Sequence, residues 1–183
     1  MTMRKFLRTF FIVILPLMFL TSCGPNVSDN VIPSYKVLSS EEVRNVISNA
    51  IPPLTMFPKI ILSDENYILP TEDWVKNQFS KELNAFTFYY KVQRTSDNRN
   101  DCDNYSLYGR TVANILNVHN TKKINAGIAV GELGYVGSLY GHAINFIITS
   151  DNFGNVKVIY YEPQAYQIIT LTDGMWAPLV FNM

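Results

Sequence analysis

Three residues in the second half of the chain have the side chains that thiol chemistry needs. Cys102 lies where a polar loop runs into a helical pattern, His142 begins an apolar strand pattern, and Glu162 ends the next one. A thiol nucleophile requires a base that accepts its proton and a third group that orients the base. The sequence therefore predicts Cys102 as the nucleophile, His142 as the base and Glu162 as the orienting group of a catalytic site.

A helix predicted over 101–118 places the thiol. With Asn100 as its expected cap, Cys102 lies in the first turn, where backbone amides and the positive end of the helix dipole favour a thiolate. The adjacent carboxylates of Asp101 and Asp103 act in the opposite direction. The face below the thiol carries small residues, which predict close packing against a sheet: Ser106, Gly109 and Ala113.

The two strands that carry His142 and Glu162 are predicted to form a hairpin. Alternate residues of 142–149 and 156–162 are apolar, so each strand has one face that we expect the helix to cover. The segment 151–155 has the pattern of the turn, and pairing residue 150 with 154 places His142 directly opposite Glu162, with Cβ atoms about 5 Å apart. A slip of one residue would move the two side chains to opposite faces.

Two further helices are predicted before this region. A capping-box pattern begins the first at Ser39, and Thr71 caps the second. Besides the hairpin, strand-forming residues predict strands at 86–92, 126–130 and 166–171. The segments expected to be loops that line a cleft are 63–70 and 133–140.

The order of Cys, His and acid resembles that of papain-like cysteine peptidases and transglutaminase-like enzymes. The motifs Cys102–Tyr105, Gly141–Asn145 and Tyr161–Gln164 look like those of compact bacterial and phage members, and of the papain-like domain attached to some fungal lectins. The resemblance covers about residues 74–171. It implies an α+β, papain-like fold with N-terminal helices and a central Cys-bearing helix packed on an antiparallel β-sheet. It also implies that Cys102, His142 and Glu162 form the catalytic triad.

The chain departs from the papain pattern at the oxyanion donor. No Gln stands a few residues before Cys102, so Gln93 and Gln164 are the candidate oxyanion or orienting residues. The third site residue is Glu162, where papain has Asn and transglutaminases usually have Asp. Hydrolysis and acyl transfer therefore both stay open.

The N-terminus has the pattern of an export signal. Basic residues precede the apolar run 10–20, and Leu20–Gly24 resembles the lipobox of bacterial lipoproteins. The pattern predicts a lipoprotein signal peptide at 1–22, a tether at 23–37 and one domain at 38–183. Acylation of Cys23 would anchor the protein in the lipid bilayer. The expected location is the bacterial cell envelope, at the outer membrane facing the periplasm.

Composition excludes several classes of partner. The chain has 2 Cys, 15 basic and 15 acidic residues. With Cys23 acylated no internal disulfide can form, and the lack of a basic patch argues against nucleic acid. A calcium loop at 97–103 fails because Cys102 and Tyr108 stand where Gly and Glu are required. Cys and His are too few for a zinc site, so no metal and no cofactor are expected.

Two functions are consistent with these patterns. The first is an envelope-anchored thiol hydrolase or acyltransferase that acts on an amide in a peptide, an isopeptide or the cell wall. The alternative is a catalytically silent lipoprotein that uses its fold for binding, for example as a phage or prophage accessory factor. The thiol discriminates between them, because only in the enzyme should His142→Ala slow the alkylation of Cys102.

Overall fold

The computed structural model describes residues 31–50, 58–92, 101–122, 124–137, 141–171 and 176–183. Its helical elements are α2 (Ser40–Ala50), α3 (Glu72–Trp74), the π-helical turn η1 (Val75–Phe79), α4 (Ser80–Tyr89) and α5 (Cys102–Val118). Its strands are β1 (Ser34–Ser39), β2 (Lys59–Ile61), β3 (Asn66–Pro70), β4 (Gly127–Ile128), β5 (Val130–Gly137), β6 (Gly141–Ser150), β7 (Val156–Glu162), β8 (Gln167–Ile169) and β9 (Trp176–Asn182). Strand residues outnumber helical residues in this part of the chain.

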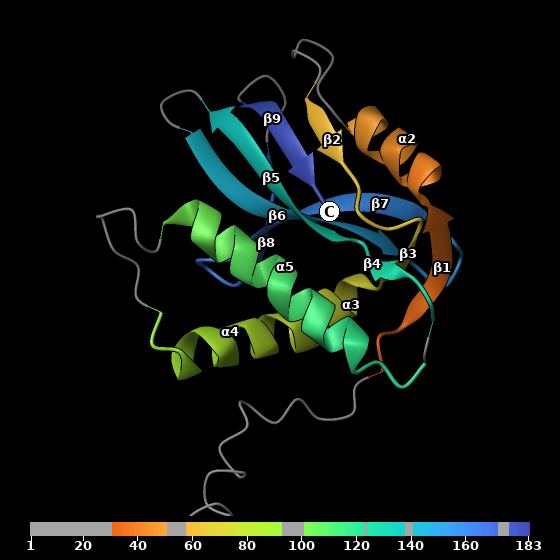
Figure 1. Ribbon diagram of the computed structural model, residues 1–183, viewed down its shortest axis with the longest axis horizontal. Coiled ribbons are helices and arrows are strands. Elements are labelled where there is room, and N and C mark those ends of the chain that lie inside the picture. The colour runs from red at the N-terminus through yellow and green to blue at the C-terminus, as the bar shows by residue number, and fades with distance from the viewer. Residues whose placement is uncertain (1–30, 51–57, 93–100, 123, 138–140, 172–175) are drawn as a thin grey trace, which may run out of the picture.

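The strands form two sheets. The larger has six strands in the order β2-β9-β5-β6-β7-β8, and the smaller has three in the order β1-β3-β4. The ladders from β9 to β8 are antiparallel, whereas β2–β9 and β3–β4 are parallel. Helix α5 crosses β5 and β6, and α4 runs on the same side of the molecule, while α2 lies beside β1 (Figure 1).

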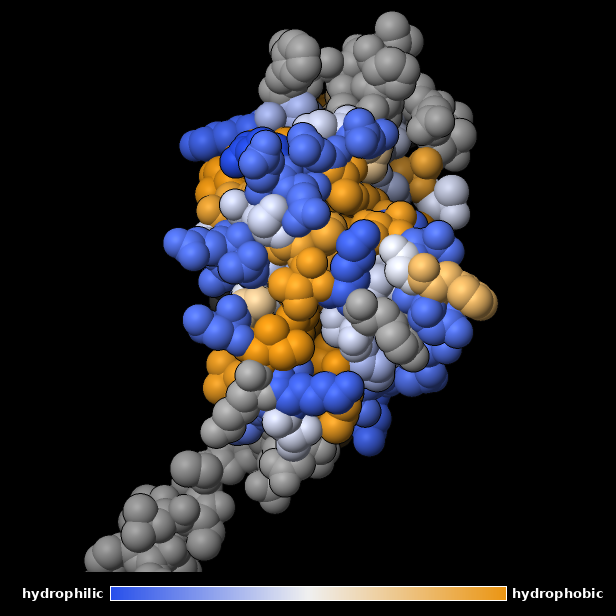
Figure 2. Space-filling model, turned by 90° about the vertical axis from the view of Figure 1, so that its right-hand side faces the viewer, coloured by the Kyte–Doolittle hydropathy of each residue, from blue (hydrophilic) through white to orange (hydrophobic). Residues whose placement is uncertain are grey.

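The large sheet is covered on both faces. On one face Ile147 packs with Leu116 of α5, in a cluster that also includes residues of α4. On the other face Phe146 packs in a cluster with Val43 of α2. Because neighbouring residues of a strand point to opposite faces, α5 and α2 lie on opposite sides of the sheet. On the side of the molecule where α2 and β1 lie, a narrow hydrophobic band runs between hydrophilic residues (Figure 2).

The run from α3 through η1 to α4 is one helix with a widened turn. Thr71 begins it, since its hydroxyl accepts a hydrogen bond from the Trp74 amide at 3.2 Å. The hydroxyl of Ser80 donates to the carbonyl of Val75, five residues back, at 2.8 Å. Tyr161 of β7 donates to the Ser80 hydroxyl at 2.8 Å and so ties the widened turn to the sheet.

Several predicted elements are confirmed. Helix α5 occupies the range expected for the Cys-bearing helix, and the cap at Thr71 is present. The capping box also forms, because the carboxylate of Glu42 accepts hydrogen bonds from the backbone N–H and the hydroxyl of Ser39 at 2.8 and 2.9 Å. Local patterns with a side-chain mechanism were therefore reliable guides to where helices begin.

Other predicted elements are wrong. The stretch 86–92 does not form a strand, since helix α4 continues to Tyr89 and Phe86 packs on Tyr108 of α5 with ring centroids 5.9 Å apart. The expected loop at 133–140 is strand β5 up to Gly137. The tertiary contact overrides the strand preference of aromatic residues in the first case.

The predicted fold class is also wrong. The prediction was a papain-like α+β domain that begins with helices and has one antiparallel sheet. The described chain begins with strand β1, and each of its two sheets includes a parallel ladder. The short strands β2 and β4 join the sheets through distant partners, which no local pattern reveals.

The N-terminal predictions lie outside the described residues. The signal peptide at 1–22 and the lipidation site Cys23 therefore stay predictions. Near the start of the described chain, the backbone N–H of Ile32 donates to Asn120 Oδ1 at 3.3 Å. Strand β1 includes the boundary predicted between 37 and 38. Within the described ranges, no helix has the length and apolar character needed to span a membrane.

Candidate functional site

His142 and Glu162 are in direct contact. Nε2 of His142 lies 2.6 Å from Oε2 of Glu162, and Oε1 of Glu162 accepts a hydrogen bond from the backbone N–H of Gln164 at 3.1 Å. The two side chains are 30% and 16% exposed. Both carboxylate oxygens are thus held, and Nδ1 of His142 makes no hydrogen bond with any described residue.

Aromatic rings line one side of this pair. The ring of Tyr135 lies edge to face against His142, with centroids 5.7 Å apart, and against Trp176, at 5.9 Å. Trp176 also packs edge to face on Tyr160 at 5.5 Å. All of these residues stand at one end of neighbouring strands. We call them the strand-end group: Tyr135, His142, Tyr160, Glu162 and Trp176.

Cys102 lies near this group without bonding to the His–Glu pair. It is the first residue of α5 and is partly buried, and Asp101 occupies the cap position expected for Asn100. Burial raises the pKa of Tyr135, and the charges of Glu162 and Cys102 raise it further. Among the described residues, the thiol makes no hydrogen bond to His142 or Glu162. The structure therefore brings His142 and Glu162 into contact and places Cys102 near Tyr135, the ring that also packs against His142.

A buried set of hydrogen bonds fixes α5 on the sheet. Ser106 Oγ donates to the carbonyl of Ile144 at 2.8 Å. Nδ2 of Asn145 donates to the carbonyls of Ser106 and Gly131 at 2.8 and 3.1 Å. A Cβ at Gly109 would lie 2.8 Å from Cγ of Asn145 and closer still to its Oδ1, so only glycine leaves room for this amide. We call Ser106, Gly109 and Asn145 the helix lock.

The predicted hairpin register is wrong by two residues. Phe146 pairs with Tyr160 rather than with residue 158, and the last pair before the turn is Ser150 with Val156. The side chain of Asp151 explains the longer loop, since its Oδ1 accepts from the backbone N–H groups of Phe153 and Asn155 at 2.9 Å each. A shift of two keeps each side chain on its face, so His142 and Glu162 still meet, diagonally rather than directly.

The face assigned to His142 also needs correction. We expected the side shared by His142, Ile144 and Phe146 to face the Cys-bearing helix. These apolar residues belong to the cluster on the α2 face, while Ile147 faces α5. Strand parity shows which residues share a face but not which helix covers it. The first turn of α5 comes near the strand-end group because it lies by the ends of β5 and β6 (Figure 1).

The other predicted site residues contribute less than expected. Gln93 lies outside the described residues. Gln164 contacts Glu162 through its backbone amide, a role that does not depend on the Gln side chain. In the part of the chain that the structure describes, no three His, Cys, Asp or Glu residues could together hold a metal ion. The roles assigned to Cys102, His142 and Glu162 stay predictions.

Sequence reasoning missed two residues that shape the site. The sequence analysis predicts a loop at Tyr135, although its alternation with the buried Leu133 is a strand signal. Asn145 was noted only as the end of a motif, although it is fully buried and a buried amide must find hydrogen-bond partners. Its Oδ1 has no partner among the described residues.

Comparisons with known proteins define the fold. No family model and no curated protein sequence matches the chain. Among solved structures, PSL1a in its complex with E64 matches with a TM-score of 0.59 and 20% identity, over 80% of this chain and 51% of that chain. Polyporus squamosus lectin bound to the human-type influenza-binding epitope Neu5Aca2-6Galb1-4GlcNAc matches with a TM-score of 0.55 and 19% identity, over 80% and 49%. The chain spans about half the length of these two chains and shares the fold of that part.

These matches correct the family and the activity inferred from the motifs. Polyporus squamosus lectin is among these neighbours, which contradicts the papain-like and transglutaminase-like recognition and the predicted thiol hydrolase or acyltransferase activity. The motifs around Cys102, His142 and Glu162 are short, and a fold hosts functions that residue order alone cannot fix. The comparisons also give no support to the predicted lipoprotein and membrane character. At this identity the matches show the fold alone, and the alternative prediction of a binding function stays a proposal.

Proposed function

We propose that the protein binds carbohydrate and that the strand-end group forms part of its sugar site. A sugar presents hydroxyl groups that need both donors and acceptors, and C–H faces that pack on aromatic rings. The contact of His142 with Glu162 beside the ring of Tyr135 supplies both kinds of surface in one place. This juxtaposition carries the proposal, and the fold shared with part of a lectin chain supports it.

The local geometry suits hydroxyl recognition. Glu162 is fixed by His142 and by the Gln164 amide, so its remaining lone pairs point in set directions. Nδ1 of His142 and the hydroxyl of Tyr135 add groups that can donate or accept. Hydrogen bonds to a carboxylate contribute about 1.5 to 3 kcal/mol each, more than neutral ones. Two such bonds and one ring contact suffice for a weak but specific sugar site.

The neighbours suggest which compounds to test. Polyporus squamosus lectin was solved with the sialylated trisaccharide, and PSL1a with E64. Because this chain matches only about half of each, either compound could belong to the other half. Calorimetric titration of the protein with the trisaccharide and with its Galb1-4GlcNAc part tests the sugar proposal. We expect binding of at least one of them.

Variants connect the binding to the strand-end group. His142→Ala and Glu162→Gln should each weaken sugar binding about tenfold or more, since each removes a charge-assisted contact. Tyr89→Phe is the matched control, because Tyr89 is an exposed phenol on α4, away from this group. Equal losses in all three variants would show a general effect on the protein rather than a site.

The thiol supplies the outcome that would overturn the proposal. The protein is incubated with E64 and its intact mass is measured, with Cys102→Ala as the control. A stoichiometric mass increase that requires Cys102, together with no sugar binding, would assign this end of the sheet to thiol chemistry instead. Sugar binding that survives Cys102→Ala and fails in His142→Ala would support the proposal.

A further inference from the structure

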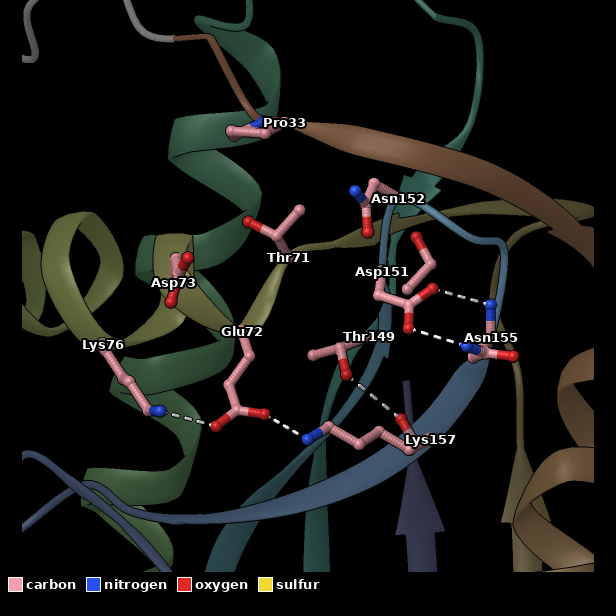
Figure 3. A pocket seen from close by; sticks show the side chains of 11 residues that line it. Pro33, Thr71, Glu72, Asp73, Lys76, Thr149, Asp151, Asn152, Asn155 and Lys157 are labelled. Atoms are coloured by element: carbon pink, nitrogen blue, oxygen red, sulfur yellow. Dashed lines mark hydrogen bonds and ion pairs between the residues drawn. The ribbon is translucent and has the colours of Figure 1, made fainter.

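A hollow lies between the start of the α3 helix and the β6–β7 hairpin. Its volume is about 710 Å³, within the range of 300 to 1,000 Å³ typical of ligand sites. The lining comes from the start of the α3–η1–α4 run and from both strands of the hairpin and its turn (Figure 3). None of the strand-end group lines it. We call it the polar hollow.

Ion pairs fix the charged side chains of the polar hollow. Glu72 lies between Lys76 and Lys157, with Oε1 2.7 Å from the Lys76 ammonium and Oε2 paired with Lys157 (Figure 3). The two lysines lower the pKa of Glu72, mainly through these hydrogen bonds. Both ammonium groups of the lining therefore already face a carboxylate.

Two further carboxylates have no cation of their own. Asp73 forms no ion pair with any described residue. The hydrogen bond and charge of Glu72 raise the pKa of Lys76, and the charge of Asp73 contributes less to this rise. Asp151 accepts hydrogen bonds only from neutral donors, among them the side-chain amide of Asn155 at 2.8 Å. The lining thus holds three carboxylates and two ammonium groups.

The rest of the lining carries hydroxyl and amide groups. Thr149 and Ser150 are 1% and 3% exposed, and the hydroxyl of Ser150 donates to the buried carbonyl of Leu69 at 3.2 Å. Thr71 and Asn152 add a hydroxyl and an amide at the rim (Figure 3). Among the described residues, no aromatic side chain lines the hollow. This composition suits a ligand with many hydroxyl groups better than a flat or apolar one.

We propose that the polar hollow binds a saccharide unit that carries an amino group and no acidic group. Its hydroxyls would meet Thr71, Asn152 and Asn155, and its ammonium would meet Asp73, while Asp151 adds negative charge on the opposite side of the hollow (Figure 3). An acidic sugar such as the sialic acid of the trisaccharide would face an excess of negative charge without a free cation. The site is separate from the strand-end group, so it does not depend on the function proposed above.

Three sugars of one ring size and different charge test the proposal. Glucosamine, glucose and glucuronic acid are titrated into the ¹⁵N-labelled protein, and the side-chain amide signals of Asn152 and Asn155 are followed by NMR. We expect glucosamine to bind most tightly, glucose more weakly and glucuronic acid not at all. The preference for glucosamine over glucose should shrink at high salt, because the charges are exposed. Equal binding of glucuronic acid, or no shift with any sugar, would overturn the proposal.

Variants separate this site from a general charge effect. Asp73→Asn should weaken glucosamine binding about fivefold and leave glucose binding nearly unchanged, as expected for loss of one exposed ion pair. Glu41→Gln on α2 is the matched control, because it removes one exposed carboxylate elsewhere. Asn152→Ala should weaken both sugars. His142→Ala should leave all these shifts unaltered; if it abolishes them, there is one sugar site and not two.

Discussion

The two faces of the large sheet use polar residues differently. On the α5 face polar side chains lie deep inside: Ser106 and Asn145 are fully buried and bonded across the helix–sheet interface, and Tyr161 bonds to Ser80. On the α2 face the cluster is apolar, and the polar side chains of this face stand at the strand ends: Ser150 at one end, buried and bonded to the Leu69 carbonyl, and His142 and Glu162 at the other, partly exposed. Buried polar pairs specify one packing arrangement, whereas exposed ones can exchange a protein partner for a ligand. We therefore expect polar substitutions on the first face to affect stability, and those on the second face to affect the binding that we propose.

The strongest test of this division is Gly109→Ala. The new Cβ would overlap the Asn145 amide, so the variant must either shift α5 or lose both hydrogen bonds of Asn145. We expect a loss of about 4 kcal/mol in the free energy of unfolding, from overpacking and unpaired carbonyls together. Urea denaturation measures it. Gly141→Ala is the control, because its nearest atom would be 3.9 Å away, and it should cost less than about 1 kcal/mol.

Asn145→Ala removes the amide without adding bulk. The carbonyls of Ser106 and Gly131 would lose their donor in a buried place, so we expect a loss of about 3 kcal/mol. Ser106→Ala removes one hydrogen bond and should cost about 1 kcal/mol. If both variants are as stable in urea as the wild type, the helix lock is not what holds α5 on the sheet.

Alkaline pH tests the Tyr161 contact on the same face. Burial raises the pKa of Tyr161 to about 12. In the unfolded chain the phenol ionises near pH 10, so the folded state holds its proton more tightly and stability falls as pH rises from 10 towards 12. This residue should account for a loss of roughly 2 kcal/mol over that window. Urea midpoints across the window should fall less steeply for Tyr161→Phe than for the wild type; parallel curves would contradict the assignment.

The α2 face should respond least in stability. His142→Ala and Glu162→Gln remove a partly exposed pair at the strand ends, so each should change the free energy of unfolding by less than about 1 kcal/mol. Calorimetric melting measures this, next to the sugar titrations. A large loss of stability in either variant would make the pair a structural contact and remove the contrast between the two faces.

The sequence allowed good prediction of features that have a local mechanism. The caps at Ser39 and Thr71 and the range of α5 follow from side chains that bond or pack within a few residues. The contact of His142 with Glu162 was predicted from parity, and it survives a wrong register because the error was an even number of residues. Parity is thus a more robust inference than register.

Features set by distant contacts were not predictable in the same way. The side chain of Asp151 lengthened the hairpin loop, and nothing in the strands themselves signals that. Which helix covers which face depends on how the two sheets pack. The prediction therefore placed α5 on the face that α2 covers. The polar hollow joins residues near 72 with residues near 151, and such a site has no local motif. The predicted activity is wrong for a related reason, because it was inferred from short motifs, and these do not define a family.

The widened turn η1 has a consequence for how this chain tolerates changes in length. A π turn holds one more residue than the α-helical turn it replaces, and the helix on either side keeps its own angular phase. Trp74 before the turn and Leu83 after it are both buried in the same cluster because the widened turn absorbs that extra residue. Deleting one residue from Val75–Phe79 would therefore restore an ordinary α-helical turn and leave the buried faces of α3 and α4 in phase. A further inserted residue would instead rotate α4 by about 100° relative to α3, so this segment should accept the loss of one residue better than the gain of one.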